Sequence, residues 1–203
     1  MNDSTDNTTE SGGKKLQSAF GDRGTNVNAI AYGHPYAEQI VKQAKEILSE
    51  SPTGLILVRT LNTFKIPIHV MKGNPREGNG YSSEMKTIFL QIPGNMDKES
   101  GEIVLNLAKS LREADQELAG HKAPDLQKDL MAYAAFMHSR NLDCLTTACK
   151  IVKELTNSAY FSNLVDTLTK LGLNEFYKAY TDGKPREELY DYYAQAHDNR
   201  GSI

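Results

Sequence analysis

The 203-residue sequence has few cysteines, and their placement argues against a disulfide framework. Its two cysteines, Cys144 and Cys149, are five positions apart in a stretch of helical character. On one helix, residues at this spacing point about 140° away from each other, so a bridge between them is not expected. Two unpaired thiols are typical of a reducing compartment. We expect both to be inert thiols in or near the core.

The sequence also lacks a recognisable targeting signal, an apolar segment long enough to span a membrane, and an excess of basic residues. The opening residues, MNDSTDNTTESGG, contain neither a basic region nor an apolar one, and no later run approaches the roughly 20 apolar residues of a membrane span. We therefore expect a soluble, cytoplasmic protein with no membrane partner, while secretion without a cleaved signal stays open. The net charge of -3 provides no basic field for phosphates, which argues against a nucleic-acid partner.

Local motifs for common chemistries are absent as well. The stretch GNPREGNG lacks the Gly-Lys-Ser/Thr ending of a phosphate loop, and no serine has a G-x-S-x-G context. No two histidines are separated by two, three or four positions, so no local metal motif is present. The five histidines are His34, His69, His121, His138 and His197. We predict no cofactor and no metal, although distant histidines could still assemble a site.

The pattern of apolar residues predicts a mainly helical α+β protein with a small sheet. Residues 1–28 are polar and cannot bury enough apolar surface to fold, so we predict a disordered tail. Helical spacing and capping residues predict helices, and alternation predicts strands. Ser51 as a cap and Pro52 in the first turn favour a helix start, Asp97 or Ser100 is expected to cap a later helix, and apolar positions from Val104 to Leu118 predict a single buried stripe on it. The expected helices are 35–50, 52–63, 97–119, 124–157 with a break near Arg140–Asn141, 160–172, 174–181 and 185–197; the expected strands are 66–72 and 87–91.

One segment, from Gly80 to Gly120, carries a resemblance. A Gly-Tyr turn, a strand and an amphipathic helix follow one another, and the helix reads LAKSLREADQ. This order resembles a bacterial metallopeptidase family of zincin type, in which a G-Y-x-P-x-x-x-x-I-x-L strand precedes a helix reading L-A-H-E-L-R-H-A-x-Q. The upstream SPTG, short helix and IPIHV strand also match its layout. The resemblance implies a metallopeptidase-like core over 29–122, with 123–203 as a helical C-terminal part of the same domain.

The residues that would bind zinc in that family are replaced. The two histidine positions hold Lys109 and Glu113, and the position of the general base holds Ser110. A lysine ammonium has no lone pair for a metal, and a hydroxyl is far less basic than a carboxylate. The resemblance therefore implies a catalytically inactive member. Lys109 and Glu113 could form an ion pair across one helical turn, or could belong to an ordinary solvated helix face.

Three functions remain open from the sequence. The leading one is a non-catalytic scaffold or protein-binding module, with His69, Glu113 and Arg112 as groove candidates and Tyr190, Tyr192 and Tyr193 as a second candidate surface. The tyrosines could equally pack back on the domain. A hydrolase with a rearranged site is the first alternative, and a helical interaction protein unrelated to peptidases is the second. The residues available for a rearranged site are Glu113, Asp115, His69 and His121.

Overall fold

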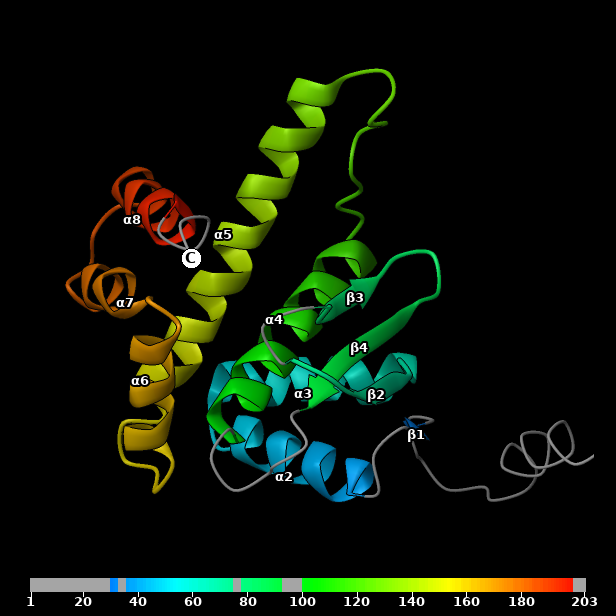
Figure 1. Cartoon of the computed structure of the whole chain (residues 1–203), viewed down its shortest axis with the longest axis vertical. Helices are drawn as coiled ribbons and strands as arrows, with labels where there is room; N and C mark the ends of the chain where they lie inside the picture. The colour runs from blue at the N-terminus through cyan, green and yellow to red at the C-terminus, as the bar shows by residue number, and fades with distance from the viewer. Residues whose placement is uncertain (1–29, 33–35, 75–77, 93–99, 199–203) are drawn as a thin grey trace, which may run out of the picture.

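The computed structural model describes residues 30–32, 36–74, 78–92 and 100–198. Helices and a small sheet form within these ranges (Figure 1). In chain order the elements are β1 (Ile30–Tyr32), α2 (Ala37–Ser49), α3 (Pro52–Phe64), β2 (Ile68–Lys72), β3 (Gly80–Ser82), β4 (Thr87–Ile92), α4 (Ser100–Leu118), α5 (Leu130–Glu154), α6 (Phe161–Lys170), α7 (Asn174–Thr181) and α8 (Arg186–Asp198). The predicted mainly helical α+β class is therefore confirmed.

The sheet has four strands in the order β1-β2-β4-β3. Strands β1, β2 and β4 run parallel, and the edge strand β3 pairs antiparallel with β4. Because side chains alternate between the faces of a strand, one face is apolar and buried, and it packs toward α4. The buried residues of this face are Ile68, Val70, Ile88, Leu90 and Ile92. His69, Met71 and Phe89 occupy the opposite face.

Helix α4 is the central element of the fold. It contacts β3 and β4 on one side and α2, α3, α5 and α6 on the others. Every residue from 101 to 108 is buried. The sequence predicted a single buried stripe, and this stripe is confirmed from Val104 to Ala114 while Leu118 is 42% exposed. Polar side chains outside the stripe, including Asn106 and Ser110, are buried too. The helix is enclosed on more sides than its amphipathic pattern indicates.

The junction between α2 and α3 is fixed by short hydrogen bonds. The Ser51 hydroxyl caps α3 by accepting the backbone N–H of Gly54 at 2.9 Å, and Pro52 occupies the first turn, as the sequence predicted. The carboxylate of Glu154, at the end of α5, accepts the Ser51 hydroxyl at 2.6 Å. It also accepts the backbone N–H of Thr53 at 2.8 Å and the Thr53 hydroxyl at 2.6 Å. Glu154 therefore fastens α5 to the start of α3.

The hydrogen bonds to the Glu154 carboxylate should make the stability of the fold depend on pH. Burial acts to raise the pKa of Glu154, but the hydrogen bonds from Ser51 and Thr53 outweigh it, and the pKa lies below its ordinary value. A carboxyl with a lowered folded pKa stabilises the fold above its unfolded pKa, about 4.3, and this stabilisation is lost as the pH falls through the folded pKa. We expect Glu154→Gln to lower the free energy of unfolding by about 2 kcal/mol at pH 7 and by much less in acid.

Urea denaturation at several pH values measures both quantities. The exposed Glu46, on α2, offers a matched control, and Glu46→Gln should change stability by less than about 0.5 kcal/mol. A Glu154→Gln penalty of constant size from neutral pH to pH 3 would contradict the assignment.

The C-terminal part packs its helices onto the same core. Buried side chains of α5 face inward, and α6, α7 and α8 contribute Leu164, Phe176 and Tyr193 to one continuous core cluster with the sheet. In Figure 1 the N-terminal half of α5 extends beyond the rest of the molecule. None of the described helices is both long and apolar enough to cross a membrane.

Two expectations about the longest helix were wrong, and one strand was missed. The helix expected over 124–157 begins at Leu130, because the Asp129 carboxylate caps it by accepting the Ala132 N–H at 2.8 Å. It also runs through Arg140–Asn141 without a break, since residues 130–154 contain neither glycine nor proline. Strand β1 was not predicted; it is only three residues long and its parallel partner β2 lies far along the chain. The predicted tail, 1–28, and the capping candidate Asp97 lie outside the described residues.

Candidate functional site

Two of the three positions that correspond to the zinc motif make hydrogen bonds within the fold. Ser110 is 1% exposed, and its hydroxyl donates to the Asn106 carbonyl at 2.8 Å. One carboxylate oxygen of Glu113 accepts the backbone N–H of Tyr81, on strand β3, at 2.8 Å. Lys109 is half-buried. Ser110 thus has no access to solvent, and Glu113 ties the edge strand to α4.

Because Glu113 is bonded to strand β3, we expect its replacement to reduce the protection of the Tyr81 amide against hydrogen exchange. A hydrogen bond to a charged acceptor contributes about 1.5–3 kcal/mol, so Glu113→Ala should lower the free energy of unfolding by about 2 kcal/mol. The Tyr81 amide should exchange with deuterium faster than in the parent chain. Glu113→Gln keeps an acceptor oxygen and should lose roughly half as much.

Hydrogen exchange followed residue by residue, together with urea denaturation, measures these effects. If the glutamine variant lost as much as the alanine variant, the bond to Tyr81 would not be the reason for the loss.

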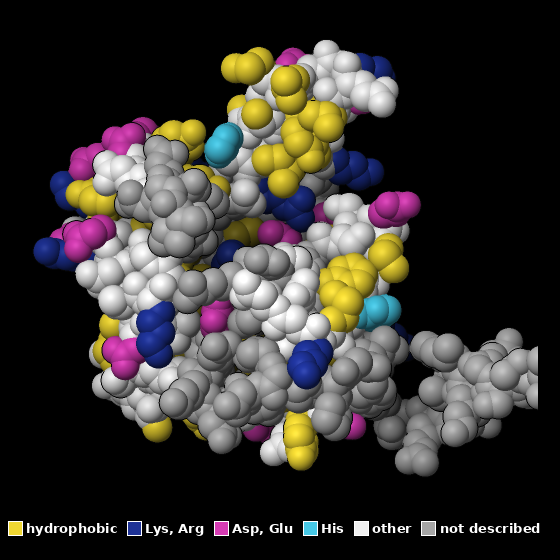
Figure 2. Space-filling model, viewed as in Figure 1, with side chains coloured by type: hydrophobic (Ala, Val, Ile, Leu, Met, Phe, Trp, Pro, Cys, Tyr) yellow, Lys and Arg dark blue, Asp and Glu magenta, His cyan; other side chains and the backbone are white. Residues whose placement is uncertain are grey.

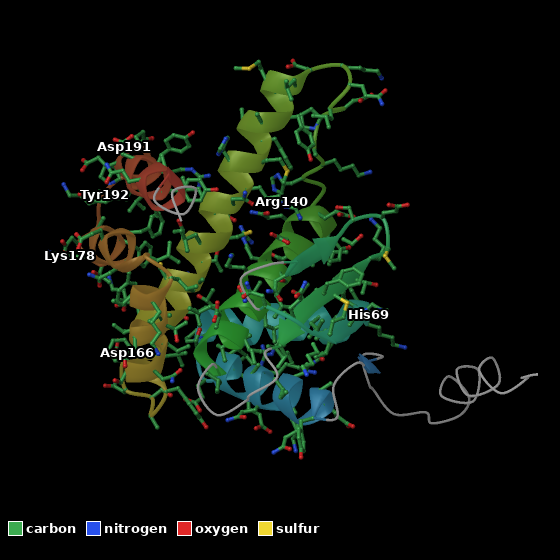
Figure 3. The ribbon with its side chains drawn as sticks, in the orientation of Figure 1. His69, Arg140, Asp166, Lys178, Asp191 and Tyr192 are labelled. Atoms are coloured by element: carbon green, nitrogen blue, oxygen red, sulfur yellow. The ribbon has the colours of Figure 1, made fainter. Side chains whose placement is uncertain are left out.

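A cleft of about 270 Å³ lies between α4 and α5. Its lining comes from α4, from the segment that follows α4, from α5 and from the first turn of α8. The lining residues are Arg112, Gln116, His121, Phe136, Ser139, Arg140, Asp143 and Arg186. Figure 3 shows Arg140 between α5 and α4, and Figure 2 shows charged side chains in the hollow beneath the projecting end of α5.

An ion-pair network forms one wall of this cleft. The Arg112 guanidinium donates to Asp143 at 2.7 Å and to Asp115 at 2.5 Å. The Gln116 amide donates to the same Asp143 oxygen at 2.5 Å. Burial acts to lower the pKa of Arg112, and the two carboxylates outweigh it and raise the pKa. Asp143 therefore finds its hydrogen-bond donors within the wall itself.

The other two arginines of the cleft are held differently. Arg186 donates from Nη2 to the Ser139 hydroxyl at 2.9 Å and to the Ser139 carbonyl at 3.2 Å. Nη2 of Arg140 is buried and makes no hydrogen bond within the described residues. Arg140 influences Glu117 electrostatically, but the Glu117 carboxylate is itself bonded to Lys86.

Both cysteines are buried, as expected from the sequence. Burial is the main cause that raises the pKa of Cys144, to about 12, with the charges of Glu113 and Asp143 adding to it. Burial also raises the pKa of Cys149. A thiol with such a pKa is protonated at neutral pH and is a poor nucleophile. The Cys144 thiol lies 3.8 Å from the amide oxygen of Gln116, behind the cleft wall.

The predicted groove candidates do not form one site. Arg112 lies in the cleft and Glu113 is bonded to β3, whereas His69 lies on the sheet face that points away from α4. There its ring meets Phe89 edge-on, at 5.4 Å between centroids. Strand β2 is also an interior strand, so His69 is not at an edge. Of the residues considered for a rearranged hydrolase, only His121 joins Arg112 in the cleft lining.

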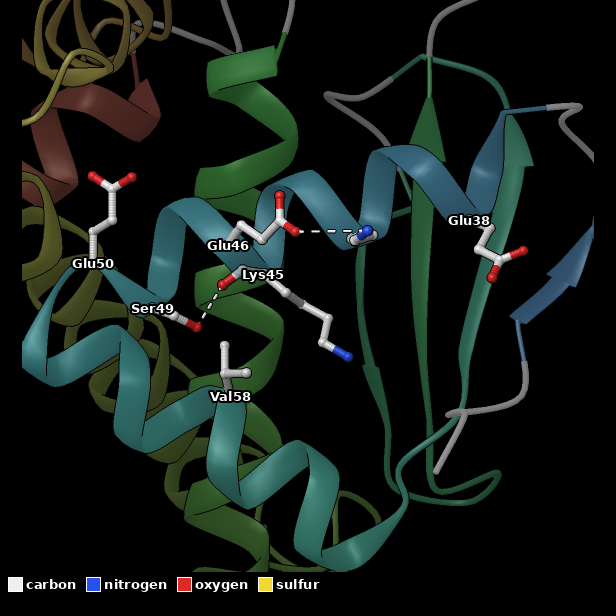
Figure 4. A pocket seen from close by; sticks show the side chains of 7 residues that line it. Glu38, Lys45, Glu46, Ser49, Glu50 and Val58 are labelled. Atoms are coloured by element: carbon white, nitrogen blue, oxygen red, sulfur yellow. Dashed lines mark hydrogen bonds and ion pairs between the residues drawn. The ribbon is translucent and has the colours of Figure 1, made fainter. Parts of the chain in front are cut away.

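A second groove, of about 550 Å³, follows the outer side of α2 and α3 (Figure 4). Its polar side chains bond to neighbours on the helix surface. Lys42 pairs with Glu46, and the Ser49 hydroxyl donates to the Lys45 carbonyl at 2.7 Å. Burial lowers the pKa of Lys45, whose ammonium lies 3.4 Å from the Asn62 side-chain oxygen. Val58 is the one apolar residue in its lining. The groove is a solvated helix surface with little to hold a ligand.

The tyrosines of α8 are divided between core and surface. Tyr193 is 5% exposed and packs in the core, whereas Tyr190 is 42% exposed. Tyr192 is half-buried against the core cluster. The ring of His138, on α5, meets Tyr190 and Tyr193 edge-on at centroid distances of 6.2 and 6.4 Å. Tyr193 is therefore a packing residue, and part of the predicted tyrosine surface is used to attach α8 to α5.

Sequence reasoning missed Arg140, Asp143 and Arg186. Arg140 and Asp143 are one turn apart on α5, which places them on one face, but no local motif links them to Arg112 or Arg186. Across the described ranges, no three His, Cys, Asp or Glu side chains are grouped closely enough to hold a metal ion. Comparison of the chain with family models, with curated proteins and with solved structures found no match in any of the three.

Proposed function

We propose that this chain is a non-catalytic, metallopeptidase-like module that binds a protein partner through the projecting half of α5. The likeness of 29–122 to the zincin-type core supports the first part of the proposal, together with the loss of all three motif residues. Ser110 and Glu113 serve the fold rather than a reaction, since one is buried and the other holds β3.

The observation that carries the binding function is an exposed apolar surface, which we name the α5 arm. Leu130 and Met131 are 65% and 78% exposed, and Leu126, just before the helix, is 49% exposed. Tyr133 and Phe136 continue this surface as half-exposed side chains. Figure 2 shows apolar side chains gathered on the upper end of the molecule, where α5 projects. Contiguous apolar surface of this kind is costly in water and marks interaction sites.

Site-specific photo-crosslinking tests the proposal in the cells that make the protein. A photoreactive p-benzoylphenylalanine replaces Met131 in one variant and the exposed Glu175, on α7, in the control. We expect a discrete adduct from position 131 that the control does not give, and its loss when Leu130→Asp is added. Because Leu130 is exposed, that change should leave the fold intact. Identical patterns from both positions would overturn the proposal.

A further inference from the structure

We propose that the cleft beneath the α5 arm binds a carboxylate of the partner polypeptide, anchored by Arg140 and Arg186. This inference rests on the proposed protein-binding function and names the chemistry that the partner must present. The carboxylate belongs to an acidic side chain that follows apolar residues seated on the arm.

The charge of the cleft favours an anion. Three arginines and His121 line it, against the single carboxylate of Asp143. Asp143 already accepts bonds from Arg112 and Gln116, and Arg112 is further occupied by Asp115. Arg112 is therefore fully engaged by two acids, which together exceed its charge by one, whereas Arg140 and Arg186 make no ion pair with either of these acids, so the three arginines still outnumber the two carboxylates. A guanidinium in a partly desolvated cleft is matched best by a planar carboxylate.

The buried nitrogen of Arg140 points to the same ligand. A buried N–H without an acceptor is unfavourable, and an oxygen placed against it removes the penalty. Arg140 also lines the cleft, so a rotation of its guanidinium group presents this nitrogen to a carboxylate that enters there. Arg186 is an exposed side chain at the start of α8, held toward α5 by two bonds to Ser139. A side chain that is already restrained loses less entropy when it binds.

The size and surroundings of the cleft favour a peptide group. A volume of about 270 Å³ accommodates one side chain or chain end, and is small for a whole cofactor. Phe136 supplies an apolar wall to the cleft and belongs to the α5 arm at the same time. The arm and the cleft thus form one continuous surface, apolar at its outer end and cationic at its inner end. A partner segment with leucine-like residues before a carboxylate complements both.

Side-chain NMR of the full chain tests this proposal with defined probes. The Nε–Hε signals of arginine are followed while acetyl-Leu-Leu-Glu-amide, acetyl-Leu-Leu-Gln-amide or inorganic phosphate is added. We expect the glutamate peptide to shift the Arg140 and Arg186 signals saturably, with a Kd on the order of 1 mM. The glutamine peptide should bind at least tenfold more weakly. Arg186→Met and Arg140→Met should each weaken the glutamate peptide at least tenfold, and Arg59→Met, at an exposed position on α3, should leave it unchanged.

Each other outcome overturns the carboxylate site. Equal binding of the two peptides would show that the arm alone holds them, and shifts with phosphate but with neither peptide would show an unselective anion site. Absence of any shift would overturn it as well. The protein-binding function fails separately, because it requires the adduct at position 131 and does not require a carboxylate.

Discussion

Replacing Gly54 with alanine should lower the free energy of unfolding by about 3 kcal/mol, even though alanine is the better helix former by about 1 kcal/mol. A Cβ at this position would lie 2.1 Å from the carbonyl oxygen of Leu48 and 2.9 Å from its carbonyl carbon. Both atoms are backbone at the end of α2, so no side-chain rotation can relieve the overlap. The start of α3 would have to move away from α2, which would disturb the bonds that Ser51 and Thr53 make with Glu154.

Chemical denaturation of the two chains measures this effect. Ile56→Ala serves as the control on the same helix, because Ile56 is 61% exposed and its truncation should cost less than about 1 kcal/mol. If Gly54→Ala were as stable as the parent chain, or more stable, the close approach of α2 and α3 would not exist in solution.

The SPTG sequence shows how much of this junction is readable from the chain. Ser51 and Pro52 indicate the start of a helix, because a serine hydroxyl can cap a helix and proline fits its first turn. Both roles were predicted correctly. The role of Glu154 was not readable, because it meets Ser51 across 103 positions of sequence. The role of Gly54 was hidden for the same reason: glycine is compatible with many local structures, and only the position of Leu48 explains it.

The residues of the candidate site were harder to predict from the sequence than the helices. The loss of zinc chemistry at Lys109, Ser110 and Glu113 is what the resemblance to the metallopeptidase family implies, and it stays a prediction. The sequence placed His69 in a groove with Glu113 and Arg112, whereas the strand register turns His69 away from α4. The Arg140 and Arg186 positions could not be found, because the two side chains come from different helices brought together by the packing of α8 on α5. Local patterns predict helices well, and sites assembled between helices poorly.

Introducing at position 110 the glutamate that the resembled family carries there should cost more than any other single change considered. Ser110→Glu would place a carboxylate at a position that is 1% exposed, where its hydroxyl now bonds the Asn106 carbonyl. Burial of a charge without a partner, together with the larger side chain, should lower the free energy of unfolding by about 4 kcal/mol or more at pH 7. The buried carboxyl should have a raised pKa, because desolvation disfavours its charged form.

The pH dependence separates charge from size. A raised folded pKa means that the unfolded chain releases its proton first, so stability should fall by about 1.4 kcal/mol per pH unit between the unfolded pKa, about 4.3, and the folded one. Ser110→Gln has nearly the same volume and no charge, so its penalty should not vary with pH. Urea denaturation of both variants from pH 4 to pH 8 gives the comparison. Equal penalties at pH 7 would mean that position 110 opens to water as a catalytic glutamate requires, and would remove a main support for a non-catalytic module.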